Sequence, residues 1–321
     1  MGAKYALITA TLLALQEPFS ALAARQLRSL DFLAFTQVAL LLSIPLMLSR
    51  PRARRDFAAI LKTAAHWPKL IALLAVGVAG LLLYDVALSS AHPIITAAIL
   101  NLSPFWAALV ARVVSKKSMP KPKLVFVVCF AVAFVGAMMV AFSQIDSDAP
   151  NLRRELIQSL FHSRWALALP MPIFFALSGS LVYHWFRDYD EGAAISANFL
   201  VSAAVLIPAS VLVAHGPFVP RLGAADAPAI FLLLIGTLAS SAAGRLFYQA
   251  SLSATENDNG FVTMFFLAIP AISAAVSWPL SSWIRQLYTI PSALFFEGLA
   301  LVMAPLLAFS MSTARGRTSA K

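Results

Sequence analysis

Long runs of apolar residues, separated by short polar segments, dominate the pattern of this chain. A run of about 20 residues matches the ~30 Å hydrocarbon core of a bilayer when it is helical. Because backbone polar groups cannot stay unpaired in lipid, each run is expected to form a helix, and none alternates polar and apolar residues as a β-barrel strand would. The runs lie at residues 5–24, 31–49, 69–89, 93–113, 123–143, 165–186, 192–213, 228–250, 260–281 and 289–311. The pattern predicts an all-α integral membrane protein with about ten transmembrane helices.

The composition fits lipid as the surrounding solvent. Apolar residues make up 60% of the 321 residues and charged residues only 12%, whereas soluble domains are about a quarter charged. The formal charge of +10 does not indicate nucleic-acid binding, because Lys and Arg sit in short clusters between the apolar runs. Nucleic-acid binding would need basic residues along one face with aromatic residues between them.

The distribution of Lys and Arg predicts the orientation, since cytoplasmic loops carry an excess of both. With a cytoplasmic N-terminus, cytoplasmic segments hold sixteen basic residues and outer segments seven, so both termini are expected in the cytoplasm. The first run is expected to be a retained helix and not a signal peptide, because Glu17-Pro18 interrupts it and another long run follows at once. Segments 51–66 and 150–162 suit either short helices on the membrane surface or solvated loops.

The two halves of the chain repeat the same features in the same order. The matching positions are Ala14-Leu15 with Ala176-Leu177, Pro45 with Pro208, Tyr84 and Leu88-Ser89 with Tyr248 and Leu252-Ser253, Pro104 with Pro270, and Ala141-Phe142-Ser143 with Ala308-Phe309-Ser310. Residues 1–145 are therefore a first five-helix repeat, 146–163 an outer connecting loop, and 164–321 a second repeat with a short cytoplasmic tail. Because five is an odd number, the second repeat is inverted in the membrane, which suits alternating access around a central site.

One motif recurs in both halves. It runs from Tyr84-x-x-x-Leu88 through Ala97-Ala98 to Leu102-Ser-Pro104, and its second copy runs from Tyr248 to Pro270. In these residues, and over nearly the whole chain, the sequence resembles the EamA-type members of the drug/metabolite transporter superfamily. The resemblance implies a multi-pass carrier of the inner (plasma) membrane that usually exports amino acids, metabolites or drugs. Family members typically carry an acidic residue at the end of the fourth helix, where this chain has Arg112.

Polar residues inside the apolar runs are the candidates for substrate binding or coupling, because ionisable groups within a membrane are costly and are functional candidates by default. They are Glu17, Gln37, Tyr84, Asp85, Asn101, Asn198, Arg245, Tyr248, Gln249 and Glu297. Pro104 and Pro270 are expected to kink their helices and to act as hinges. The spacing Gly236-x-x-x-Ser240-x-x-x-Gly244 is expected to let two helices pack closely.

Glu17 is the first choice for a central role. Pro18 removes a backbone donor and frees a carbonyl one turn back, near Ala14. Because desolvation disfavours a charged carboxylate, Glu17 could gain and lose a proton during a transport cycle; a neutral Glu17 bonded to a neighbouring helix is equally open. Glu297 has no adjacent helix breaker, which favours a structural hydrogen bond there, and Asp85 lies far enough outward to reach the outer interface.

The sequence thus predicts a secondary active transporter of small organic metabolites, amino-acid-like solutes or drugs, and not an enzyme. No cofactor or metal is expected, and the expected partners are the solute, the lipid bilayer and a coupling proton. The chain is expected as a monomer or homodimer. A membrane-embedded enzyme, a non-transporting scaffold, and a uniporter or exchanger are the alternatives. The His-Glu-x-x-His and Gly-x-Ser-x-Gly motifs, which would favour an enzyme, are absent from the sequence.

Arg245 has two interpretations that a substitution separates. Its guanidinium could hold a substrate carboxylate by two hydrogen bonds, or it could extend to the cytoplasmic surface from the inner third of its helix. Direct recognition predicts that Arg245→Gln abolishes uptake of carboxylate-bearing solutes into proteoliposomes and spares the other solutes. An equal loss for every solute would indicate a role in folding or gating instead.

Overall fold

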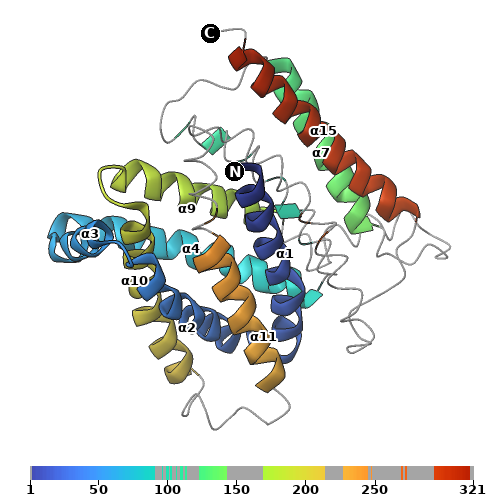
Figure 1. The fold of residues 1–321 in the computed structure, drawn as a ribbon. Helices are drawn as coiled ribbons and strands as arrows, with labels where there is room; N and C mark the ends of the chain where they lie inside the picture. Colours follow the sequence, from blue (N-terminus) through green and yellow to red (C-terminus); the bar gives the residue numbers. More distant parts are fainter. Residues whose placement is uncertain are drawn as a thin grey trace.

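The computed structural model describes residues 2–90, 123–142, 169–213, 227–244 and 293–318, together with single positions between them. Within these residues every regular element is a helix. The first part contains α1 (Gly2–Gln26), α2 (Ser29–Met47), α3 (Pro51–Lys62), the 3-10 turn η1 (Ala64–His66), α4 (Trp67–Ser90) and α7 (Lys123–Phe142). The second part contains α9 (Met171–Phe186), α10 (Glu191–Val213), α11 (Ala227–Leu238) with its π-helical continuation η5 (Ala239–Gly244), and α15 (Ala293–Thr318) (Figure 1).

Eight of the ten predicted runs overlap helices in this part of the chain, and α15 continues to Thr318, beyond its predicted end at residue 311. The runs at 93–113 and 260–281 fall mostly outside the described residues, so the count of ten stays a prediction. Four helices are long and apolar enough to cross a membrane, at Leu7–Ala24, Ser29–Met47, Ala64–Leu88 and Glu191–Leu212. Shorter apolar helices lie at Val127–Val140, Met171–Phe186, Ala227–Ser241 and Ala293–Pro305. These helices indicate a membrane protein.

Large apolar side chains also cover the outward faces of these helices. Leu42, Ile71, Leu212 and Phe231 each expose more than half of their surface. A soluble monomer rarely exposes large contiguous apolar areas, whereas lipid solvates such side chains without cost. The exposed faces therefore agree with a lipid environment.

The helices of the first part pair with those of the second. α1 packs against α11 and η5, α2 against α10, α4 against α9, and α7 against α15. Figure 1 shows α7 and α15 lying side by side along one edge of the molecule. Much of the described buried core therefore lies between helices of the first part and helices of the second.

Two glycines allow the closest of these contacts. A Cβ atom added to Gly136 of α7 would lie 2.6 Å from the carbonyl oxygen of Gly298 in α15, and one added to Gly298 would lie 2.7 Å from that of Gly136. The backbones of the two helices therefore touch. A Cβ at Gly236 of α11 would lie 3.2 Å from Cβ of Phe19 in α1, so the close packing expected of the Gly236 run is confirmed there.

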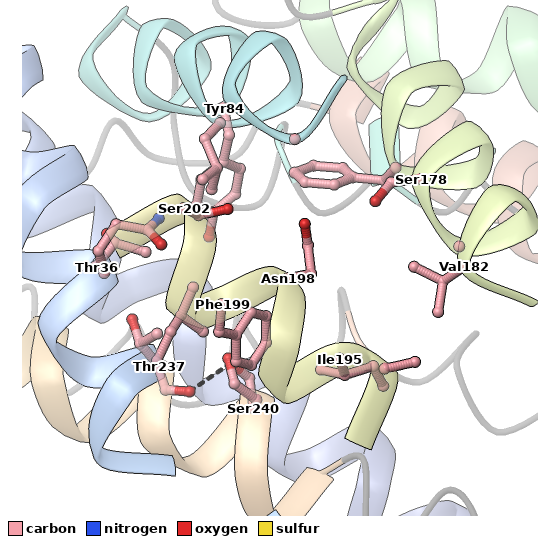
Figure 2. A pocket seen from close by; sticks show the side chains of 18 of the residues that line it. Thr36, Tyr84, Ser178, Val182, Ile195, Asn198, Phe199, Ser202, Thr237 and Ser240 are labelled. Atoms are coloured by element: carbon pink, nitrogen blue, oxygen red, sulfur yellow. Dashed lines mark hydrogen bonds between the residues drawn. The ribbon is translucent and has the colours of Figure 1, made fainter. Parts of the chain in front are cut away.

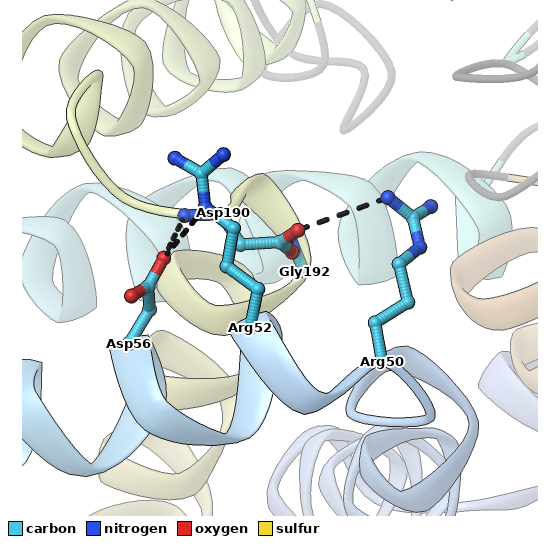
Figure 3. Close-up of polar contacts among 5 residues, drawn as sticks. All are labelled: Arg50, Arg52, Asp56, Asp190 and Gly192. Atoms are coloured by element: carbon cyan, nitrogen blue, oxygen red, sulfur yellow. Dashed lines mark hydrogen bonds and ion pairs between the residues drawn. The ribbon is translucent and has the colours of Figure 1, made fainter.

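Of the two interpretations open for segment 51–66, the helix is present as α3, and polar contacts fix it to α10 (Figure 3). Asp190 caps the start of α10 by accepting a hydrogen bond from Gly192 N at 2.9 Å, while its own backbone N donates to Asp56 Oδ2 at 2.8 Å. Arg50 lies 3.7 Å from the Asp190 carboxylate and Arg52 lies 3.5 Å from that of Asp56. The apolar face of α3 packs on α10. Whether α3 also contacts lipid stays a prediction.

The glycine contact between α7 and α15 should contribute to the thermal stability of the protein. Gly136→Ala should lower the melting temperature of the purified protein in detergent, because the added methyl group must push the two backbones apart, at a cost of roughly 1–3 kcal/mol. Gly77→Ala in α4 is the matched control, since a Cβ there would have nothing within 4 Å. The control gains the same helix propensity and should melt at or above the wild-type temperature. If Gly136→Ala melts with its control, the close approach is wrong.

Candidate functional site

A cavity of about 750 Å³ lies between α1, α2, α4, α9, α10 and the α11–η5 helix. This volume is within the range of pockets that bind small molecules. Figure 2 shows its wall, with Tyr84 on α4, Ser178 and Val182 on α9, Asn198 and Ser202 on α10, and Thr237 on α11. Both parts of the chain therefore contribute to a single cavity.

Glu17 and Tyr84 form the polar contact at its deep end. Glu17 is 4% exposed although it lies in the middle of α1, and Tyr84 Oη donates a hydrogen bond to Glu17 Oε2 at 3.3 Å. The Tyr84 ring is held edge-on against Phe175, with ring centroids 6.2 Å apart. α1 continues as a helix through Pro18, which has no N–H to donate to the Ala14 carbonyl. The Glu17 carboxyl group and the Ala14 carbonyl, which lacks its helical donor, are thus close to each other along α1.

An apolar cluster lies next to the cavity beyond Tyr84, at the end of the bundle where α1 ends and α2 begins. We call this cluster the apolar seal; its large members are Leu22, Leu27, Phe32, Leu88, Met171 and Leu233. Tyr84 belongs to the cluster and also lines the cavity. In the opposite direction the cavity reaches Arg187, Tyr189 and Glu191 at the turn between α9 and α10. Arg187 and Glu191 are exposed there, so within the described residues the cavity has large apolar side chains at one end and solvent-exposed residues at the other.

Four of the predicted site residues meet in this cavity: Glu17, Gln37, Tyr84 and Asn198 all line it. Asp85 is buried, with 2% exposure, and its Oδ1 has no hydrogen-bond partner within the described residues; its depth at the outer interface stays a prediction. Glu297 is exposed on α15 and is not among the described lining residues. The predicted site residues Asn101, Arg245, Tyr248 and Gln249 and the predicted hinges Pro104 and Pro270 lie outside the described residues.

Several lining residues could not be recognised as site residues in the sequence. Those with hydroxyl groups are Thr36, Ser178, Ser202, Thr237, Ser240 and Ser241. Such groups are hard to interpret because Ser and Thr in a helix often bond to the preceding turn. Thr36 Oγ1 donates to Phe32 O at 2.9 Å and Ser240 Oγ to Thr237 O at 3.1 Å. The only sequence feature that pointed to any of these residues is that Thr36 precedes the candidate Gln37.

The cavity wall is suited to bind an organic solute with an apolar body. Leu40, Leu81, Phe175 and Phe199 supply apolar surface, and Tyr84 is hydrogen-bonded to Glu17 in the same wall. In the described part of the chain, no three His, Cys, Asp or Glu side chains are grouped as metal ligands. The chemistry that these described residues offer is therefore reversible binding through hydrogen bonds, the carboxyl groups of Glu17 and Glu191, and apolar contact.

The fold is similar to that of a protein known from a crystal structure. The two share 16% sequence identity, and the match covers 97% of this chain and 99% of that chain with a TM-score of 0.58. Likeness at this level of identity concerns the fold alone. No model of a known protein family and no curated protein matches the sequence.

The open and closed ends of the cavity can be tested by thiol labelling. Cys129 is the only cysteine of the chain, so a Cys129→Ala background reports on a single introduced thiol. Ser178→Cys in the cavity wall should react readily with a charged thiol reagent added to the purified protein. Ala21→Cys should react at least tenfold more slowly, because Ala21 is 0% exposed at the apolar seal. Equal rates at both positions would contradict a cavity closed at this end.

Proposed function

We propose that this chain is a secondary carrier that moves a small organic solute across the membrane by alternating access. The observation that carries the proposal is the cavity between the two parts of the chain, which has the apolar seal next to it at one end and reaches the exposed α9–α10 turn at the other, within the described residues. A central site accessible from one end only is what one state of an alternating-access carrier requires. A scaffold without transport has no need of a cavity that contains a shielded carboxyl group.

The pairing of helices supports two inverted repeats. If α1, α2, α4 and α7 correspond to α9, α10, α11 and α15, exchanging the two halves turns the α1–α11 contact into the α9–α4 contact. The α2–α10 and α7–α15 contacts turn into themselves, and all four contacts are present. Such a symmetric arrangement can exchange the shapes of its halves and so open the opposite end. It is also the arrangement that a ten-helix, EamA-type member of the drug/metabolite transporter superfamily would have.

The distribution of basic residues assigns sides to the two ends. It places the α9–α10 turn, with Arg187 and the basic α3 helix nearby, in the cytoplasm of a cell with an inner (plasma) membrane. In this proposal the described state is open to the cytoplasm and closed to the outside. Export as the direction of transport rests on the family resemblance.

Glu17 is the coupling group of the proposed carrier. It is the acidic side chain at the deep end of the described cavity wall, and Tyr84 is its hydrogen-bond donor. A carboxyl group in this position can hold either a proton or an amine-bearing solute. Exchange between the two, combined with a change of the open end, would couple solute movement to a proton gradient.

Glu17→Gln tests this coupling in proteoliposomes. The solute is identified first by saturable counterflow in a screen of amino acids, nucleosides and cationic drugs. Because Gln cannot ionise, Glu17→Gln should lose most of the stimulation that a pH gradient gives to uptake, while counterflow without a gradient persists. Glu297→Gln, at an exposed position on α15, is the matched control and should behave as wild type.

Two results would count against this account. An unchanged response of Glu17→Gln to the pH gradient would remove Glu17 from the coupling mechanism. Absence of saturable flux for every solute, with correctly folded wild-type protein, would remove the carrier itself.

A further inference from the structure

The wall of the cavity contains polar atoms that lack hydrogen-bond partners in the described part of the chain. Gln37 is 0% exposed, and neither its amide oxygen nor its amide nitrogen has a partner in the described part of the chain. Asn198 Oδ1 and Thr237 Oγ1 are without partners there too. All three residues line the cavity. Because a buried polar group without a partner costs free energy, a ligand group in the cavity that pairs with these three side chains would gain hydrogen bonds from them.

The cluster offers both donors and acceptors from three helices. Gln37 comes from α2, Asn198 from α10 and Thr237 from α11. Figure 2 shows Asn198 and Thr237 approaching the cavity from two different helices. The Gln37 amide donates through nitrogen and accepts through oxygen, Asn198 Oδ1 accepts, and the Thr237 hydroxyl does both. A ligand group that matches them must itself carry donors and acceptors, as an amide, a urea or the edge of a nucleobase does.

The charges around the cavity disfavour a negatively charged group at this end. Glu17 is the carboxyl group at this end. Among the described residues of the wall, the cation is Arg187, which lies at the exposed turn. The Arg187 side chain is 69% exposed. A carboxylate bound beside Gln37 would therefore meet another carboxyl group and no described counter-ion, and an unpaired buried charge is strongly unfavourable.

We infer that the deep end takes an uncharged head of the solute that carries both hydrogen-bond donors and acceptors, with Gln37 as the specificity-determining residue, and that it rejects carboxylates. The apolar body of the solute lies against Leu81, Phe175 and Phe199, which line the same cavity. The inference rests on the proposed carrier function and names the substrate class of that site. The competing assignment is a carboxylate held by Arg245.

Two nearly isosteric probes test the inference: phenylacetamide, whose head is an uncharged amide, and phenylacetate, whose head is a carboxylate. Equilibrium binding of each probe to the purified full-length protein should show at least tenfold tighter binding of phenylacetamide. Gln37→Met keeps the length of the side chain and removes its donors and acceptors. It should weaken phenylacetamide binding about tenfold and leave phenylacetate binding unchanged.

The variant also separates recognition from a structural role. Since the Gln37 amide has no described partner, Gln37→Met should keep the wild-type melting temperature or raise it. The matched control is Gln26→Met, because Gln26 is exposed at the end of α1 and should change neither binding nor melting. A lowered melting temperature together with an unchanged preference between the probes would overturn the role of Gln37.

Binding and counterflow measured on the same preparation separate an error in the proposed head group from an error in the proposed carrier function. Tighter or equal binding of phenylacetate would overturn it and favour the Arg245 assignment, and absence of measurable phenylacetamide binding would overturn it as well. Saturable counterflow of any solute by the same preparation would leave the carrier in place in each of these cases. Absence of both binding and counterflow would remove the proposed function together with the inference.

Discussion

In a bilayer, apolar side chains gain little by leaving lipid for protein, so helices associate through close packing and hydrogen bonds. The described structure depends on this close packing, because its main helix pairs each join one part of the chain to the other. Gly136 and Gly298 let α7 and α15 touch backbone to backbone, and Gly236 brings α11 against Phe19 of α1. These close contacts hold the two parts of the chain together, so a cavity can remain between them.

That space acquires its character from the size and polarity of the side chains along it. Large apolar side chains such as Phe32 and Leu88 fill the end near the α1–α2 turn, while a mixture of polar and apolar side chains lines the cavity itself. Glu17 and Gln37 lie where these two regions meet, shielded from solvent. Polar groups are costly in such surroundings unless something pairs with them. A bound solute and a proton are the partners that account for both residues, and this links the packing of the bundle to the proposed transport cycle.

The sequence predicted much of the fold and part of the site. Most helix ends could be read because the change from apolar to polar residues marks the limits of the membrane. Glu17 could be recognised because acids inside apolar runs are rare. The hydroxyl residues Thr237 and Ser240 could not, because such groups can bond within their own helix. Asp85 and Glu297 could be placed only by depth, and the structure shows Asp85 buried and Glu297 exposed.

The depth of a residue along its helix therefore follows from the sequence, whereas the direction in which its side chain faces depends on the tertiary structure. The sequence by itself determined that the chain forms apolar helices, where they begin and end, and which ionisable residues lie between those ends, because the bilayer imposes these properties on each segment separately. Only the tertiary structure decided which faces meet. Helices that are apolar on all sides carry no stripe that selects an inner face, so the meeting of Glu17 with Tyr84, and of Gln37 with the cavity, depends on how the two parts of the chain pack.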